Sequence, residues 1–209
     1  MHDTTVLPST TGTSARGRRR WRVVDIVIAS VLGVASGLLF LLWNAAYNPL
    51  SAPLELALPG LQALLGGGWL FAGVLTGLVV RKPGAALYGE LLAAAVSALV
   101  GNQWGASTLL SGLVQGLGAE IVFALFLYAN WRLYVAVLAG MGAGLALAVN
   151  DLIFYYAGAS ATFAVIYVIA ALVSGAVIAG LLSWLAVRGL ARTGALNRFA
   201  SGRDASARL

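Results

Sequence analysis

Long apolar runs dominate the chain, and short polar segments separate them. A run of about 20 apolar residues, at about 1.5 Å of helix per residue, is long enough to cross a hydrocarbon core of about 30 Å. The pattern therefore predicts an all-α membrane domain over residues 21–190. Its six transmembrane helices are expected at residues 23–46, 61–80, 84–100, 107–128, 133–157 and 161–187.

The segments outside these runs have a different composition. Residues 1–20 are rich in Ser, Thr, Gly and Arg, which predicts a disordered tail, and residues 191–209 form a second, basic tail. The first apolar run continues for more than 20 residues without a small-residue cleavage site, so we expect a retained helix rather than a secretory signal. Three prolines within residues 47–60 favour a structured loop over a helix.

Composition and the placement of charge agree with this arrangement. Of the 209 residues, 60% are hydrophobic and 10% are charged, whereas about a quarter are charged in a typical soluble domain. All 13 Lys and Arg residues lie before the first span, between spans two and three or four and five, or after the sixth span. The positive-inside rule then predicts that both termini are cytoplasmic, and the net charge of +6 requires no nucleic-acid partner.

The sequence offers little for catalysis. It has no cysteine, and its one histidine, His2, lies in the tail, which argues against a metal centre built on these ligands. Neither a Gly-x-Ser-x-Gly motif nor a phosphate-binding loop is present. An intramembrane aspartyl protease needs two aspartates, and Asp151 is the only one deep within a span. A non-catalytic protein without a cofactor is therefore expected.

Several polar and aromatic residues lie inside the spans or at their outer ends, where a charged side chain in lipid costs about 2.5–3.5 kcal/mol. Their estimated depths converge on the outer half of the bundle, below the proline-rich segment, which predicts a binding pocket open to the exterior. The candidate substrate-binding residues are Asn44, Trp69, Glu90, Trp104, Gln115, Glu120, Asn150, Asp151 and Tyr155.

Each candidate also has a structural alternative. Glu90 and Glu120 would hydrogen-bond to neighbouring helices, Asp151 would cap or pair near the surface, and aromatic residues such as Tyr47 would belong to the interfacial belt. Glycines repeat at four-residue spacing beside these groups, as at Gly112 and Gly116, which is typical of close helix packing. The sequence leaves these alternatives open.

A set of short motifs resembles the YkoE-type substrate-binding (S) components of energy-coupling factor (ECF) transporters, over residues 22–200. The motifs are Leu-Leu-Trp-Asn at 41–44, Gly-Trp-Leu-Phe-Ala-Gly at 68–73, Arg-Lys-Pro-Gly-Ala-Ala at 81–86, Gly-Glu-Leu-Leu-Ala-Ala at 89–94, Trp-Gly at 104–105, Ser-Gly-Leu-Val-Gln-Gly-Leu-Gly-Ala-Glu at 111–120 and Asn-Asp at 150–151.

The resemblance implies a six-helix S component of the bacterial cell membrane that captures thiamine or its hydroxymethylpyrimidine precursor. It also implies two kinds of partner, a transmembrane coupling protein and two ABC ATPases that supply the energy. S components of this kind dock through a small-x-x-x-small surface on the first helix, and the matching positions here are Ala29 and Gly33. Glycine at 33 departs from a strict Ala-x-x-x-Ala form.

Two other function classes remain compatible with the residues. A stand-alone, proton-coupled secondary transporter of a small cationic or heterocyclic solute would use Glu90, Glu120 or Asp151 as its proton carrier. A membrane scaffold without a small ligand would use the same groups for packing.

The residues also bear on the choice of ligand that the resemblance implies. An aminopyrimidine suits Glu, Gln and aromatic faces, and three intramembrane carboxylates favour cationic thiamine over its uncharged precursor.

Overall fold

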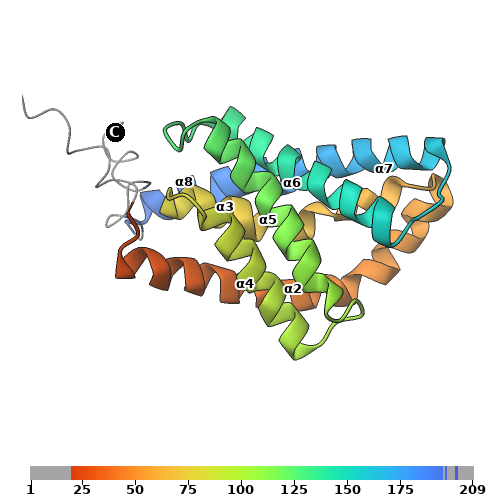
Figure 1. Ribbon diagram of the computed structural model, residues 1–209, viewed down its shortest axis with the longest axis horizontal. Helices are drawn as coiled ribbons and strands as arrows, with labels where there is room; N and C mark the ends of the chain where they lie inside the picture. The colour runs from red at the N-terminus through yellow and green to blue at the C-terminus, as the bar shows by residue number, and fades with distance from the viewer. Residues whose placement is uncertain (1–19, 195, 197–200, 202–209) are drawn as a thin grey trace, which may run out of the picture.

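The computed structural model describes residues 20–194, 196 and 201, and every regular element in that part of the chain is helical (Figure 1). Most of the two predicted tails lies outside the described residues. The elements are α2 (Val23–Ala57), the 3₁₀-helix η1 (Leu61–Leu65), α3 (Gly67–Val80), α4 (Ala85–Val100), α5 (Ser107–Leu125), α6 (Leu133–Phe154), α7 (Ala161–Ser174), the π-helix η2 (Gly175–Leu182) and α8 (Ser183–Arg192).

These elements group into six rods that match the six predicted spans. η1 and α3 together cover Leu61–Val80, and α7, η2 and α8 form one rod of 32 residues. Five of the rods are long and apolar enough to cross a membrane, and α4 is a shorter apolar helix of 16 residues. The predicted all-α architecture with six apolar helical segments is confirmed for the described residues.

The first helix differs from the prediction because it continues to Ala57 instead of ending near residue 46. Pro49 and Pro53 lie inside this helix, so the expectation that these prolines favour a loop was wrong. The two prolines are four residues apart and both are exposed, so the backbone carbonyls that they leave without N–H partners lie on an outer face. Proline inside a helix is a common cause of a kink, and Figure 1 shows α2 turning at its far end.

Helix α3 is the innermost element. Eleven of its 14 residues are buried, and they surround the helix instead of forming one stripe. A helix that is apolar on all sides is stable only where other helices cover it on all sides. Accordingly, α2, α4, α5, α6, η2 and α8 all pack against α3, and the α3–α4 turn brings α4 alongside it (Figure 1).

Glycine stripes set the close helix contacts, as predicted. On α5, a Cβ added to Gly112 would overlap Ala94 of α4, and one added to Gly116 would lie 3.1 Å from the Leu87 backbone. Gly118 lies instead against Gly142 of α6. The face of α5 that carries Gly112 and Gly116 therefore packs on α4.

The small residues of α2 are also used inside the chain, which corrects the docking prediction. Ala29 is fully buried, and a Cβ on Gly33 would lie 3.0 Å from the Leu92 side chain of α4. Small residues allow two helix backbones to approach closely, and here α4 takes that place. The Ala29 and Gly33 surface is therefore covered and unavailable to a coupling protein in this structure.

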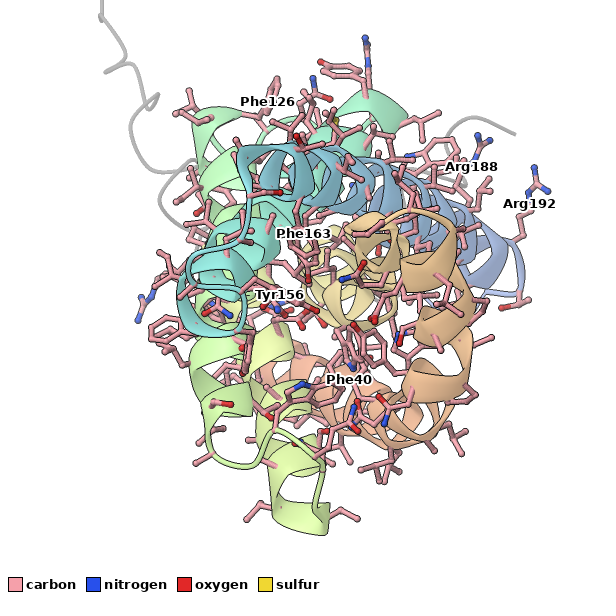
Figure 2. The ribbon with its side chains drawn as sticks, turned by 90° about the vertical axis from the view of Figure 1, so that its right-hand side faces the viewer. Phe40, Phe126, Tyr156, Phe163, Arg188 and Arg192 are labelled. Atoms are coloured by element: carbon pink, nitrogen blue, oxygen red, sulfur yellow. The ribbon has the colours of Figure 1, made fainter. Side chains whose placement is uncertain are left out.

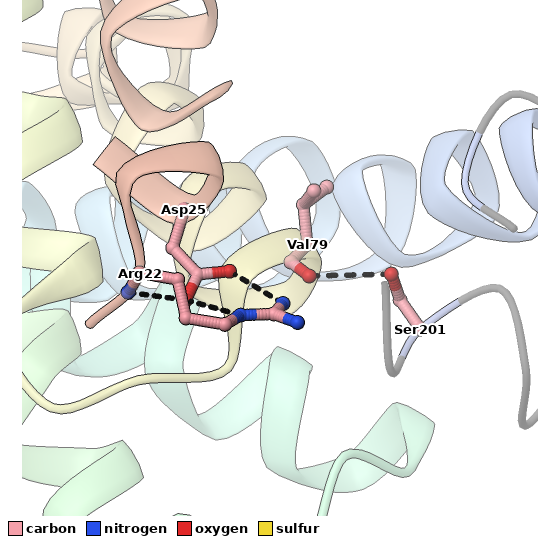
Figure 3. Close-up of polar contacts among 4 residues, drawn as sticks. All are labelled: Arg22, Asp25, Val79 and Ser201. Carbon is pink, nitrogen blue, oxygen red and sulfur yellow. Dashed lines mark hydrogen bonds and ion pairs between the residues drawn. The ribbon is translucent and has the colours of Figure 1, made fainter. Parts of the chain in front are cut away.

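All seven Lys and Arg residues within the described part of the chain lie at one end of the bundle, at the left of Figure 1. There Arg22 forms an ion pair with buried Asp25 at 2.8 Å, and the Ser201 hydroxyl donates to the Val79 carbonyl at 3.2 Å (Figure 3). The Ser201 contact places residue 201 at the end of α3, and the Trp21 indole N–H, which donates to the Pro83 carbonyl at 2.9 Å, joins the start of α2 to the turn after α3. We call this end of the bundle the basic end.

Candidate ligand-binding cavity

A cavity of about 330 Å³ lies between the helices towards the end opposite the basic end. Phe40 and Tyr156, which both line it, lie near the middle of the bundle in the end-on view of Figure 2. Seven of the nine predicted substrate-binding residues line this cavity: Asn44, Trp69, Glu90, Trp104, Gln115, Asp151 and Tyr155. The structure thus brings together residues from α2, α3, α4, α5, α6 and the α4–α5 turn.

Three aromatic rings form one wall, which we call the aromatic triad: Tyr47, Trp69 and Trp104. The centroid of Trp69 is 5.0 Å from that of Tyr47 and 5.2 Å from that of Trp104, and Tyr47 and Trp104 are 5.7 Å apart. The rings meet edge to face or at a tilt, a favoured geometry for aromatic pairs. The triad therefore offers apolar ring surface to a flat ligand.

Hydrogen bonds hold this wall in place. The Trp69 indole N–H donates to Asn44 Oδ1 at 2.7 Å, and Asn44 Nδ2 donates to Ser97 Oγ at 3.1 Å. A buried indole N–H without an acceptor would carry a desolvation cost, so Asn44 fixes one orientation of the Trp69 ring.

The cavity is also lined by a carboxylate with polar partners, Asp151. Tyr167 donates its hydroxyl to Asp151 Oδ2 at 2.7 Å, and Asn150 Nδ2 donates to Asp151 Oδ1 at 3.1 Å. Tyr156 lies beside Tyr167, with ring centroids 5.1 Å apart, and Gln62 Nε2 donates to the Tyr156 hydroxyl at 3.4 Å. Asp151 is therefore held by donors on both oxygens while it lines the cavity.

Glu90 is the second carboxylate of the cavity, and it is only half satisfied. Its side chain is 1% exposed, and Oε2 accepts the backbone N–H of Gly73 at 2.6 Å. Oε1 is buried and has no hydrogen-bond partner among the described residues. Buried polar atoms are nearly always paired in folded proteins, so this oxygen of a cavity-lining residue is an acceptor without a donor in the ligand-free protein.

Glu120 is not at the cavity, which corrects its predicted role. Its carboxylate accepts the backbone N–H groups of Gly84, Ala86 and Leu87 at 2.6, 2.9 and 3.2 Å, and the Tyr128 hydroxyl at 2.7 Å. The first N–H groups of a helix lack partners within it and carry partial positive charge. Glu120 of α5 thus caps the N-terminus of α4, the interhelical alternative left open by the sequence.

Replacing Glu120 with glutamine is expected to lower stability and leave ligand affinity unchanged. The variant loses the charge that three backbone N–H groups share, at a cost of about 1.5–3 kcal/mol for hydrogen bonds to a charged group. Thermal unfolding of the purified protein measures the first effect and equilibrium ligand binding the second. A folded variant with wild-type stability and weakened binding would instead show that Glu120 takes part in ligand binding.

Asn150 also lies outside the cavity wall. Its Nδ2 donates to Ser111 Oγ at 3.2 Å as well as to Asp151, so it links α6 to α5 and orients Asp151 without lining the cavity. Asn150 was predicted to contact the ligand, whereas in the structure it reaches the cavity only through its hydrogen bond to Asp151.

Sequence reasoning did not select Tyr167, although a signal was present. Tyr167 lies six residues into the sixth predicted span, and Asp151 lies six residues from the outer end of the fifth, so the two were at the same estimated depth. The other cavity residues that were not selected are Phe40, Tyr47, Gln62, Ala63, Gly66, Ala94, Ser97, Thr108, Ser111, Gly112, Leu147 and Tyr156.

Comparisons with known proteins indicate the family of the chain. The family described as "ABC-type cobalt transport system, permease component" matches residues 24–146, which is more than half of the chain. The "Putative HMP/thiamine permease protein YkoE" of Bacillus subtilis (strain 168) is 38% identical over 190 residues, covering 89% of this chain and 92% of that protein.

A solved structure extends the similarity to three dimensions. The chain matches the "Crystal structure of an S-component of ECF transporter" with a TM-score of 0.77 and 34% identity, over 90% of this chain and 95% of that one. Sequence and fold are thus similar over nearly the whole length of both relatives. The chain belongs to the YkoE-type S components of energy-coupling factor transporters, and is therefore a multi-pass protein of the cell membrane.

Proposed function

We propose that the protein captures thiamine or its hydroxymethylpyrimidine precursor from outside the cell. It would deliver the ligand together with a transmembrane coupling protein and two ABC ATPases, and catalyse no reaction itself. The observation that carries the proposal is a single cavity lined by the aromatic triad, by Asp151 and by Glu90, whose Oε1 is unpaired. The printed name of the Bacillus subtilis relative, an HMP/thiamine permease, supports the same ligand class.

The distribution of charge supports an outward-facing cavity. The described Lys and Arg residues gather at the basic end, and none of them lines the cavity. Because cytoplasmic loops carry the excess of basic residues in membrane proteins, we infer that the basic end is cytoplasmic. The cavity then lies in the outer half of the bundle, where a ligand from the exterior enters.

The chemistry of the walls fits an aminopyrimidine. Its exocyclic amine would donate to Oε1 of Glu90, and its flat ring would lie against the aromatic triad. A cationic thiazolium would gain from the carboxylate of Asp151 and from nearby tyrosine faces. Two carboxylates without a basic residue at the wall favour thiamine over the uncharged precursor.

Cobalt, which the matched family description names, finds less support. Among the residues that the structure describes, no group of three or more His, Cys, Asp or Glu side chains is placed to hold a metal ion. Asp151 and Glu90 line the cavity together with aromatic rings and amides, and soft or borderline divalent metals prefer imidazole or thiolate ligands.

Ligand binding by the purified protein tests the proposed substrate. Thiamine is expected to quench tryptophan fluorescence in a saturable way, because Trp69 and Trp104 line the cavity. Hydroxymethylpyrimidine and Co²⁺ should be titrated in parallel. Failure of both thiamine and hydroxymethylpyrimidine to bind would refute the proposed ligand class, and saturable Co²⁺ binding would replace it.

Transport by reconstituted liposomes tests the dependence on partners. Liposomes that contain only this protein are expected to show no uptake of thiamine under a proton gradient, because uptake would require the coupling protein and its ATPases. Concentrative uptake by the protein alone would instead establish a secondary transporter.

A further inference from the structure

Asn102 lies in the α4–α5 turn, two residues before Trp104, and it does not line the cavity. Its Oδ1 accepts three donors: the backbone N–H of Trp104 at 2.9 Å, that of Gly105 at 2.9 Å, and the Thr108 hydroxyl at 3.0 Å. Its Nδ2 donates to Ser97 Oγ at 3.1 Å. One side chain thus joins the end of α4, the turn and the start of α5.

Little else determines the shape of this turn. Gly101 and Gly105 flank it with φ values of 106° and 59°, a left-handed region that glycine enters without strain. A Cβ added to either glycine would meet no heavy atom within 4 Å, so packing does not hold the backbone there. Two other side-chain hydrogen bonds hold the turn, and both are exposed to solvent: Asn48 donates to Gln103, and the Ser107 hydroxyl donates to the Trp104 carbonyl at 2.7 Å. The hydrogen bonds of Asn102 to the Trp104 amide and the Thr108 hydroxyl are partly buried, so Asn102 is the main restraint on the turn that is shielded from water.

The turn carries the only member of the aromatic triad that does not lie on a helix. Trp104 contacts Tyr47 and Trp69 through its ring, and its backbone N–H is held by Asn102. Ser97 accepts hydrogen bonds from both Asn102 and Asn44, and Asn44 in turn holds Trp69. A continuous chain of polar contacts therefore fixes two rings of the triad relative to each other.

We propose that Asn102 is a positioning residue that holds Trp104 over the cavity and thereby sets how fast the ligand leaves. The proposal rests on the proposed function, since it concerns the same cavity. Asn102 acts through the backbone of Trp104 without touching the ligand. Loss of its acceptor oxygen frees the turn between two glycines, and the Trp104 ring then spends time away from Tyr47 and Trp69.

Hydrogen exchange in the ligand-free, full-length protein tests the restraint itself. In Asn102→Ala, the amide of Trp104 should exchange about tenfold faster, as expected when one hydrogen bond of about 1.4 kcal/mol is lost. The Gly105 amide keeps the backbone carbonyl of residue 102 as an acceptor at 3.3 Å and should change less. Asn102→Asp keeps the acceptor oxygens and should exchange at the wild-type rate. Unchanged exchange in Asn102→Ala, or fast exchange in a folded Asn102→Asp, overturns the proposal.

Asn130 provides a matched control in another turn. Its Oδ1 accepts the Arg132 backbone N–H at 3.2 Å, and its Nδ2 donates to the Tyr134 hydroxyl, at the basic end. Asn130→Ala should leave exchange at Trp104 and Gly105 at the wild-type rate. Faster exchange there in Asn130→Ala would show a general loosening of the bundle and would contradict a specific role for Asn102.

Stopped-flow binding of thiamine tests the consequence for the ligand. Asn102→Ala should raise the dissociation rate about tenfold and change the association rate little. Because Asn102 acts through Trp104, the double variant Asn102→Ala and Trp104→Ala should release the ligand no faster than Trp104→Ala alone. If the two residues acted independently, the increases in dissociation rate would multiply. A multiplicative double variant overturns the proposal. If the wild type binds no pyrimidine, the proposed function fails, and the exchange experiment still decides the role of Asn102.

Discussion

Replacing Trp69 with alanine is expected to weaken thiamine binding by about 30- to 1000-fold, or about 2–4 kcal/mol. Trp69 is the central ring of the triad, because it lies 5.0 Å from Tyr47, 5.2 Å from Trp104 and 6.4 Å from Trp43. Its removal takes away ring surface and leaves Asn44 Oδ1 without its donor. Fluorescence loses a reporter in this variant, so isothermal titration should measure the affinity.

Two further variants separate the contributions of Trp69. Trp69→Phe keeps a ring but loses the indole N–H, so we expect a smaller loss of about tenfold. Trp184→Ala removes a tryptophan at the basic end, where its ring lies under Arg188, and should bind like the wild type. A folded Trp69→Ala variant with wild-type affinity would show that the aromatic triad does not contribute to ligand binding.

The six apolar segments were predictable because membrane thickness sets a minimum length that an apolar run reveals directly. The prolines were less informative, because a proline marks a position where a helix can bend but does not show whether the helix ends there. Pro49 and Pro53 illustrate this, because both lie on an exposed face of α2 where the lost hydrogen bonds do not disturb packing. Helix α2 therefore runs 11 residues past its predicted end.

The candidate site was predictable in outline but not residue by residue. Glu90 and Glu120 both lie near the middle of their predicted spans, yet only Glu90 lines the cavity. The face of the helix does not decide the difference, because Gly112 shares the face of Glu120 and lines the cavity. Glu120 lies eight residues further along α5, where it caps the N-terminus of α4. A sequence gives the face and the approximate depth of a residue but not which neighbour it meets.

The same limit explains the two remaining differences. The Ala29 and Gly33 stripe is suited to close packing with any helix, and its occupant, α4, follows from the three-dimensional arrangement alone. Asn102 lies in a short turn where Asn and Gly are common for local reasons. Its four hydrogen-bonded partners all lie within six residues, but its effect on Trp104 matters only because Tyr47 and Trp69 are close by.

Close contact between α6 and η2 makes Gly140 the position where a single methyl group should cost most. A Cβ on Gly140 would overlap the carbonyl oxygen of Gly175 and lie 2.7 Å from the backbone nitrogen of Gly180. A Cβ on Gly175 would in turn overlap the Gly140 carbonyl oxygen. Every one of these neighbours is backbone, so no side chain can rotate away, and the two helices must separate.

Gly140→Ala is therefore expected to lower the melting temperature by roughly 2–12 °C, since overpacking costs about 1–3 kcal/mol and each kcal/mol shifts Tm by about 2–4 °C in a protein of this size. Gly189→Ala is the matched control, because a Cβ at this helical glycine of α8 would meet no atom within 4 Å. Its melting temperature should stay the same or rise slightly, because alanine favours helix over glycine. Thermal unfolding in the same detergent compares the Gly140→Ala and Gly189→Ala variants. Equal melting temperatures would show that α6 and η2 accept a methyl group at position 140 without loss of stability.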